Sequence, residues 1–174
     1  MAALAELLDP AYPGPLAERS LDELRAMRAE CQDVETGLSL LRRVVQGHLD
    51  IVGAEVRRRA DGSDTAGLAD LIEQLPALLA DRTHAPGVGR LPQLMAPAEA
   101  DPGLEDELAQ VLARGSADLG SLDDPALASL AEGLTGFEQK VSGHRRSLFD
   151  RIDALQAEIT RRYREGEATV DALL

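Results

Sequence analysis

Two segments of the chain repeat apolar residues with the period of a long, paired helix. They span residues 20–61 and 123–165, and each predicts a helix of about 40 residues, or roughly 60 Å. In both segments the apolar residues recur every seven positions, in rows spaced as the a and d positions of a coiled coil. The rows are Leu24, Cys31, Leu38, Val45 and Val52 with Met27, Val34 and Leu41 in the first segment, and Leu127, Leu134, Val141, Leu148 and Leu155 with Leu130 and Phe137 in the second.

Capping and stop signals place the ends of both predicted helices. Ser20 followed by Glu23 forms a capping box, and an Asp-Gly-Ser sequence at 61–63 ends the first helix. Pro125 is placed at the favoured first position of the second helix, which ends before Gly166. The chain then divides into a loosely ordered N-terminal segment (1–19), a first coiled-coil helix (20–61), an acidic connector (62–122), a second coiled-coil helix (123–165) and a C-terminal tail (166–174).

The connector carries most of the excess negative charge, because residues 62–122 hold ten acidic and three basic side chains. Its pattern predicts short helices near 66–80, interrupted or kinked at Pro76, and near 103–114, separated by a loop rich in proline and glycine. A connection of this length can reverse the chain. We therefore expect an all-α fold, a long antiparallel two-helix coiled coil (helical hairpin) with short helices in the connector. An extended chain, or pairing between molecules, is the alternative arrangement.

A stripe of polar residues occurs on both long helices, at an offset of 103 positions. In the first helix its spacing is E-x3-S-x2-R-x3-Q-x3-D, which places five side chains within an arc of about 80° that borders the apolar seam. Antiparallel pairing would bring the two stripes together about a pseudo-twofold axis, an arrangement that suits a roughly twofold-symmetric ligand. The stripes are Glu35, Ser39, Arg42, Gln46 and Asp50, and Glu138, Ser142, Arg145 and Asp153, with Phe149 where the second glutamine would map.

The side chains of the stripes suit a guanine nucleotide. Arginine presents a planar fork of donors for guanine O6 and N7 or for phosphate, and a carboxylate accepts from the N–H groups on guanine's Watson–Crick edge. Serine and glutamine supply smaller, adaptable hydrogen bonds. Two copies of this set favour a small cyclic nucleotide with two purines and two phosphates over a long polyanion.

The doubled pattern resembles the signature of the RsiG family, actinobacterial anti-sigma factors that bind cyclic di-GMP. The resemblance covers the two long helices, about half of the chain. It implies an antiparallel coiled coil that binds cyclic di-GMP as a regulatory ligand, singly or as a stacked dimer, and sequesters a WhiG-type sporulation sigma factor. It makes the nine stripe residues the nucleotide-contacting set. Phe149 then offers a stacking face, and Arg43 and Arg146, which also repeat, are further candidates for phosphate contact.

Composition excludes several other functions. The chain has 31 acidic and 18 basic residues and a net charge of −13, so its field repels DNA, RNA and anionic bilayers. An aromatic content of 2% disfavours a sheet core, and a single cysteine excludes a disulfide framework or a multi-thiolate zinc site. No apolar run approaches the length of a membrane span. We expect a cytoplasmic protein without direct nucleic-acid or membrane contact.

A ligand-free structural coiled-coil scaffold or oligomerisation module is the alternative function, because the heptads alone support it. The sequence contains no Gly-rich phosphate loop, nucleophile elbow or zinc-protease motif, so we expect no catalysis, no catalytic cofactor and no metal. His48 and His144 fall on d-type positions and are interpreted as packing residues, and an enzyme that uses either ranks far behind. The arginines at 57–59 and 161–162 are interpreted first as complements of the helix macrodipole.

Overall fold

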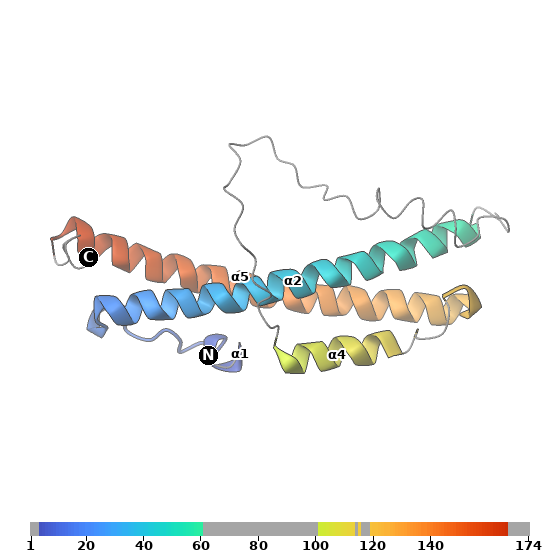
Figure 1. Ribbon diagram of the computed structural model, residues 1–174, viewed down its shortest axis with the longest axis horizontal. Helices are drawn as coiled ribbons and strands as arrows, with labels where there is room; N and C mark the ends of the chain where they lie inside the picture. The colour runs from blue at the N-terminus through green and yellow to red at the C-terminus, as the bar shows by residue number, and fades with distance from the viewer. Residues whose placement is uncertain (1–3, 61–100, 114, 116–118, 167–174) are drawn as a thin grey trace, which may run out of the picture. The chain divides into compact units, whose positions relative to one another are not determined.

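A computed structural model describes residues 4–60, 101–113, 115 and 119–166, and the secondary-structure elements within these ranges are all helices. The all-α class is therefore confirmed (Figure 1). Both long helices begin and end within one residue of their predicted bounds, and the predicted helix near 66–80 lies outside the described residues. The elements are α1 (Leu4–Leu7), the 3-10 helix η1 (Leu16–Glu18), α2 (Leu21–Ala60), α4 (Pro102–Ala113), the 3-10 helix η2 (Leu119–Ser121) and α5 (Asp124–Arg164).

The structure consists of two compact units, and each contains part of both long helices. The first unit combines α1, η1, α2 up to Leu40 and α5 from Val141 onward. The second unit combines α2 from Leu41 onward, α4, η2 and α5 up to Lys140.

Within each unit the two long helices run in opposite directions (Figure 1). In the first unit Arg28 of α2 donates a hydrogen bond to Gln156, and Glu35 accepts one from Arg145. The residue number of the α5 partner decreases as the residue number on α2 increases, which is expected for antiparallel helices. In the second unit Arg42 pairs with Glu138 and Arg59 with Asp124, which shows the same order. The predicted antiparallel pairing is confirmed.

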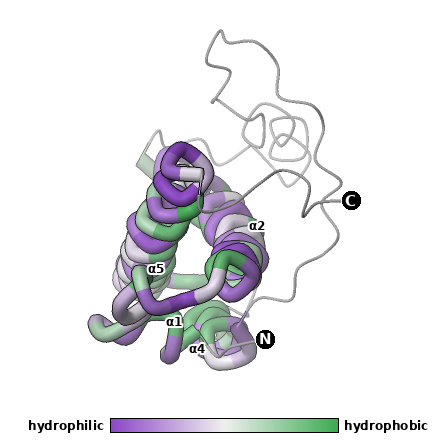
Figure 2. The backbone as a smooth tube through the Cα atoms, turned by 90° about the vertical axis from the view of Figure 1, so that its left-hand side faces the viewer, coloured by the Kyte–Doolittle hydropathy of each residue, from purple (hydrophilic) through white to green (hydrophobic). Residues whose placement is uncertain are grey.

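One heptad row of each long helix supplies the core of both units. The ten residues of these rows, from Leu24 to Val52 and from Leu127 to Leu155, are each at most 3% exposed. Burying one such leucine or valine side chain stabilises a fold by about 1.5–3 kcal/mol. The other row is mixed, with Leu41 buried and Met27 partly exposed. Hydrophobic and hydrophilic residues accordingly alternate along both long helices (Figure 2).

Side-chain caps begin both long helices. The Glu23 backbone N–H donates to Ser20 Oγ at 3.2 Å, and the Ser20 backbone N–H donates to Glu23 Oε2 at 2.7 Å. The capping box is thus present, and the Ser20 N–H holds the pKa of Glu23 below its usual range. At α5 it is Asp123 that caps, since its Oδ1 accepts from the Ala126 N–H at 2.8 Å. Pro125 is consequently the second helical residue, one position later than the sequence predicted.

Residues 4–19, which were expected to be loosely ordered, pack against the long helices of the first unit. Leu7 is fully buried, and the Tyr12 hydroxyl lies 3.7 Å from Sγ of Cys31, itself a core residue at 0% exposure. Arg151 donates to the Asp9 carbonyl oxygen at 3.0 Å. Three prolines favoured an irregular chain, but buried leucines and long-range hydrogen bonds hold this segment in place.

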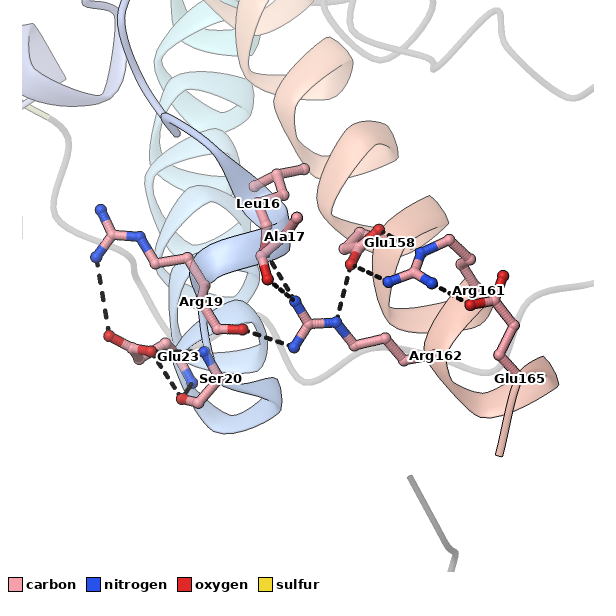
Figure 3. Close-up of polar contacts among 9 residues, drawn as sticks. All are labelled: Leu16, Ala17, Arg19, Ser20, Glu23, Glu158, Arg161, Arg162 and Glu165. Atoms are coloured by element: carbon pink, nitrogen blue, oxygen red, sulfur yellow. Dashed lines mark hydrogen bonds and ion pairs between the residues drawn. The ribbon is translucent and has the colours of Figure 1, made fainter. Parts of the chain in front are cut away.

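Arg162, near the end of α5, holds the segment that leads into α2 (Figure 3). Its guanidinium donates to the carbonyl oxygens of Leu16 at 2.8 Å and Arg19 at 2.6 Å, and to Glu158 Oε1 at 2.8 Å. Arg162 is 8% exposed, so these partners compensate for the loss of its hydration. Arg162 lies in the last turn of α5, where its charge complements the macrodipole, and its hydrogen bonds to the segment before α2 are an additional role.

Arg59 makes the equivalent contacts in the second unit. It donates to the carbonyl oxygen of Leu119 at 2.9 Å, to Glu55 Oε1 at 2.7 Å and to Asp124 Oδ1 at 2.8 Å. Leu119 is the first residue of η2, as Leu16 is of η1, and the two leucines are 103 positions apart. The internal repeat therefore includes the 3-10 helix before each long helix, a feature that the heptads did not reveal.

Candidate functional site

Four of the predicted site residues meet in the first unit, and we call this group the first half-site: Glu35, Ser39, Arg145 and Phe149. Oε1 of Glu35 accepts from Arg145 Nε at 2.9 Å and Nη2 at 2.8 Å, across the two long helices. The same oxygen accepts from Ser39 Oγ at 2.7 Å. The Arg145 guanidinium carbon lies 5.4 Å from the centroid of the Phe149 ring, within cation–π range. Glutamate and arginine are therefore joined, and both side chains are largely buried, at 15% and 19% exposure.

Three further predicted residues meet in the second unit and form the second half-site: Arg42, Gln46 and Glu138. Arg42 Nη1 lies 3.5 Å from Glu138 Oε1, and Gln46 Nε2 donates to the same oxygen at 3.4 Å. Among the described residues the buried Nε of Arg42 has no hydrogen-bond partner. This half-site holds the same glutamate and arginine chemistry with looser contacts.

Helical spacing and the internal repeat explain why each half-site contains one glutamate and one arginine. Glu35 and Arg42 lie seven residues, or two turns, apart on one face of α2, and α5 repeats that spacing with Glu138 and Arg145. Because the helices are antiparallel, the glutamate of each copy faces the arginine of the other copy. The two cross-helix pairs are therefore equivalent under the repeat.

The other five predicted site residues lie on the same two long helices. Asp50 and Asp153, which end the two stripes, are exposed, and so are Arg43 and Arg146. Ser142 is half-buried on α5, four residues after Glu138. The contacts given above join seven of the twelve named candidates in cross-helix groups.

Each half-site offers a carboxylate acceptor next to a guanidinium fork of donors. A ligand with neighbouring donors and acceptors, such as the edge of guanine, can hydrogen-bond to the carboxylate and to the guanidinium at once. Its bonds would then take the place of the bonds between these two groups. Since the glutamate and the arginine come from different helices, such a ligand would connect α2 with α5 within that unit. Sequence reasoning identified these residues but missed their pairing with one another, which the offset of 103 combined with antiparallel packing could have revealed.

His48 lines a cavity of about 200 Å³ in the second unit, together with apolar residues that include Val52, Leu130 and Leu134. The imidazole thus faces a cavity that residues of α5 also line. Among the described residues no group of three or more His, Cys, Asp or Glu side chains is placed to hold a metal ion. Within the same ranges, each helix is too short or too polar to cross a bilayer.

The fold and the half-sites define an all-α protein whose two long antiparallel helices carry a duplicated glutamate–arginine site. The chain belongs to the RsiG-like family, whose model matches residues 10–79 and 113–174. The matched ranges contain both half-sites and both 3-10 helices, which confirms the resemblance seen in the doubled motif. Comparison with curated proteins yields no match. Family membership indicates a role of the anti-sigma-factor type and, in general, a sigma-factor partner.

Proposed function

We propose that the protein is a cyclic di-GMP-dependent anti-sigma factor that acts without catalysis and sequesters a WhiG-type sporulation sigma factor. The observation that carries the proposal is the equivalent glutamate–arginine pair in each of the two units. A structural coiled coil needs neither the repeat of these pairs nor their partial burial. Cyclic di-GMP carries two guanines and two phosphates, and each unit presents an acceptor and donor set that suits a guanine or a phosphate.

In each glutamate–arginine pair, hydrogen bonds to the nucleotide would replace the hydrogen bonds between the two side chains. Guanine N1–H and N2–H can donate to the carboxylate of Glu35 or Glu138, while Arg42 or Arg145 donates to guanine O6 and N7 or to phosphate. A second nucleotide can stack on the first. The bound nucleotide would replace a contact between two protein side chains with contacts to both helices.

Ligand-dependent capture of the sigma factor requires that the nucleotide favour the partner-binding state. A ligand shifts an equilibrium only by its difference in affinity for the two states. Nucleotide that connects α2 and α5 within a unit would favour one packing of these helices, and the sigma factor would bind that packing. The net charge of −13 supports a protein partner with a basic, DNA-contacting surface, because opposite charges steer the encounter.

Calorimetry with the full-length protein tests nucleotide binding. We expect wild type to bind cyclic di-GMP, and the double variant Arg42→Ala/Arg145→Ala to lose at least 100-fold in affinity, since losing two charged donors costs about 3 kcal/mol or more. Arg57→Ala, an exposed arginine of α2 outside both half-sites, is the matched control and should bind as wild type does. Cyclic di-AMP, which lacks O6 and the guanine amino group, should bind poorly. Wild type that stays silent at high micromolar ligand would contradict the proposal.

The buried heptad rows favour one other function, a structural scaffold or oligomerisation module without a small ligand. In that case the glutamates and arginines would serve only to fix the pairing of the helices. The same titration separates the two functions, since a scaffold would bind neither nucleotide.

A further inference from the structure

The two half-sites are equivalent in sequence but closed to different degrees. In the first, two atoms of the Arg145 guanidinium lie within 2.9 Å of Glu35 Oε1. In the second, the Arg42 guanidinium approaches Glu138 only to 3.5 Å, and within the described part of the chain its buried Nε has no hydrogen-bond partner. The side chains of Arg42 and Glu138 are 29% and 21% exposed, against 19% and 15% for Arg145 and Glu35. The first half-site is closed and the second is open.

The single departure from the repeat accounts for this difference. Phe149 stands four residues after Arg145, and its ring lies 5.4 Å from the guanidinium, so it supports that arginine against Glu35. Gln46 stands four residues after Arg42 and instead donates to Glu138 Oε1, the oxygen that Arg42 approaches. Arg145 therefore has a supporting ring four residues later, whereas the residue four positions after Arg42 is an amide that binds the carboxylate instead.

We propose that nucleotide binds first at the second half-site, that the first half-site fills only when Arg145 leaves Glu35, and that Phe149 is the positioning residue that sets this order. This inference rests on the proposed function. At Arg42 the contact that a ligand oxygen displaces, 3.5 Å between Nη1 and Glu138 Oε1, is longer than an ordinary hydrogen bond. At Arg145 the ligand must first break two charge-assisted hydrogen bonds of normal length, which are the stronger kind.

Titration of the full-length protein with cyclic di-GMP tests the order. We expect two steps whose Kd values differ at least tenfold, which corresponds to about 1.4 kcal/mol. Arg42→Ala should weaken the tight step at least tenfold, and Arg145→Ala should remove the weak step. Phe149→Gln restores the residue of the first copy and should tighten the weak step. The two Kd values should then agree within about threefold, which in free energy is about half of a tenfold difference.

Phe149→Tyr is the conservative variant, because it keeps the ring and should therefore keep the two steps apart. Phe149 is 43% exposed, so these replacements should leave the melting temperature close to that of wild type, and a purely structural role would not change the ratio of the two Kd values. Equal affinities in wild type, equal effects of the two arginine variants on the tight step, or an unchanged ratio in Phe149→Gln would each overturn the order. None of these results would contradict nucleotide binding itself, which fails only if wild type does not bind at all.

Discussion

Glu55 and Glu158 continue the second heptad row of each long helix, and each pairs with two arginines of its own helix. Glu55 accepts from Arg58 at 2.7 Å and from Arg59 at 2.7 Å, and these hydrogen bonds lower its pKa to about 2 although partial burial opposes them. Glu158, its equivalent in the first unit, accepts from Arg161 and Arg162, which lower its pKa to about 2 as well. A glutamate can occupy a seam position here because two guanidinium groups neutralise it.

The depressed pKa values predict how stability depends on pH. A carboxylate with a folded pKa of about 2 and an ordinary value of 4.5 stabilises the fold above pH 4.5, and this contribution is lost as the pH falls from 4.5 toward 2. We expect the double variant Glu55→Gln/Glu158→Gln to be less stable than wild type at pH 7 and to lose less stability over that window. Urea denaturation at pH 7, 4.5 and 3 measures this difference.

The control for that experiment is Glu132→Gln, which changes an exposed glutamate of α5. Its stability should follow the wild-type curve at every pH. If wild type and the double variant lose stability in parallel between pH 4.5 and 3, the two glutamates are not the groups that titrate.

At the scale of elements, the end of each long helix holds the start of the other. Arg162 of α5 binds the carbonyl oxygens of η1 and of the residue before Ser20 (Figure 3). Arg59 of α2 binds η2 and Asp124. These contacts also fix the two 3-10 helices, which are too short to be stable alone. Each unit thus closes its antiparallel pair at one end with a single arginine.

Removing the Arg162 side chain tests that role. We expect Arg162→Ala to destabilise the protein by about 2 kcal/mol. The oxygen atoms that accept hydrogen bonds from the buried guanidinium would lose that donor. Amide hydrogen exchange should rise in residues 4–19 and stay unchanged at 119–122. Arg59→Ala should show the reverse pattern, and Arg164→Ala, an exposed neighbour, should change neither segment. Equal exchange in wild type and Arg162→Ala would show that the buried leucines alone hold the N-terminal segment.

The long elements could be predicted from sequence, whereas the short ones could not. Forty residues of heptad pattern, a capping box at Ser20 and the doubled stripe determine α2, α5 and the membership of the half-sites, because each is a local or periodic signal. Helix α1 and both 3-10 helices span less than two turns, and distant contacts such as that of Arg162 with Leu16 hold them. The pairing of Glu35 with Arg145 also needs a register between helices that no single segment specifies.

At the scale of the whole molecule, the internal repeat and the net charge point to how regulation would work. Each unit has a 3-10 helix, the beginning of one long helix, the end of the other and one half-site, so under the proposed function each unit would respond to nucleotide through its own half-site. The net charge of −13 keeps such a protein away from DNA and favours a basic partner. Capture of that partner would then depend on whether the half-sites are occupied.

This dependence gives the last prediction, a complex that forms only with ligand. Purified protein mixed with a WhiG-type sigma factor should elute as a larger species on size-exclusion chromatography with cyclic di-GMP present, and as separate proteins without it. Because the sigma factor and the nucleotide favour the same state, each should also tighten the other's binding by the same factor. Arg42→Ala/Arg145→Ala should fail to form the complex at ligand concentrations that saturate wild type, and Arg57→Ala should form it normally. A complex of equal stability with and without nucleotide would leave the protein a sigma-factor binder but would refute its control by the messenger.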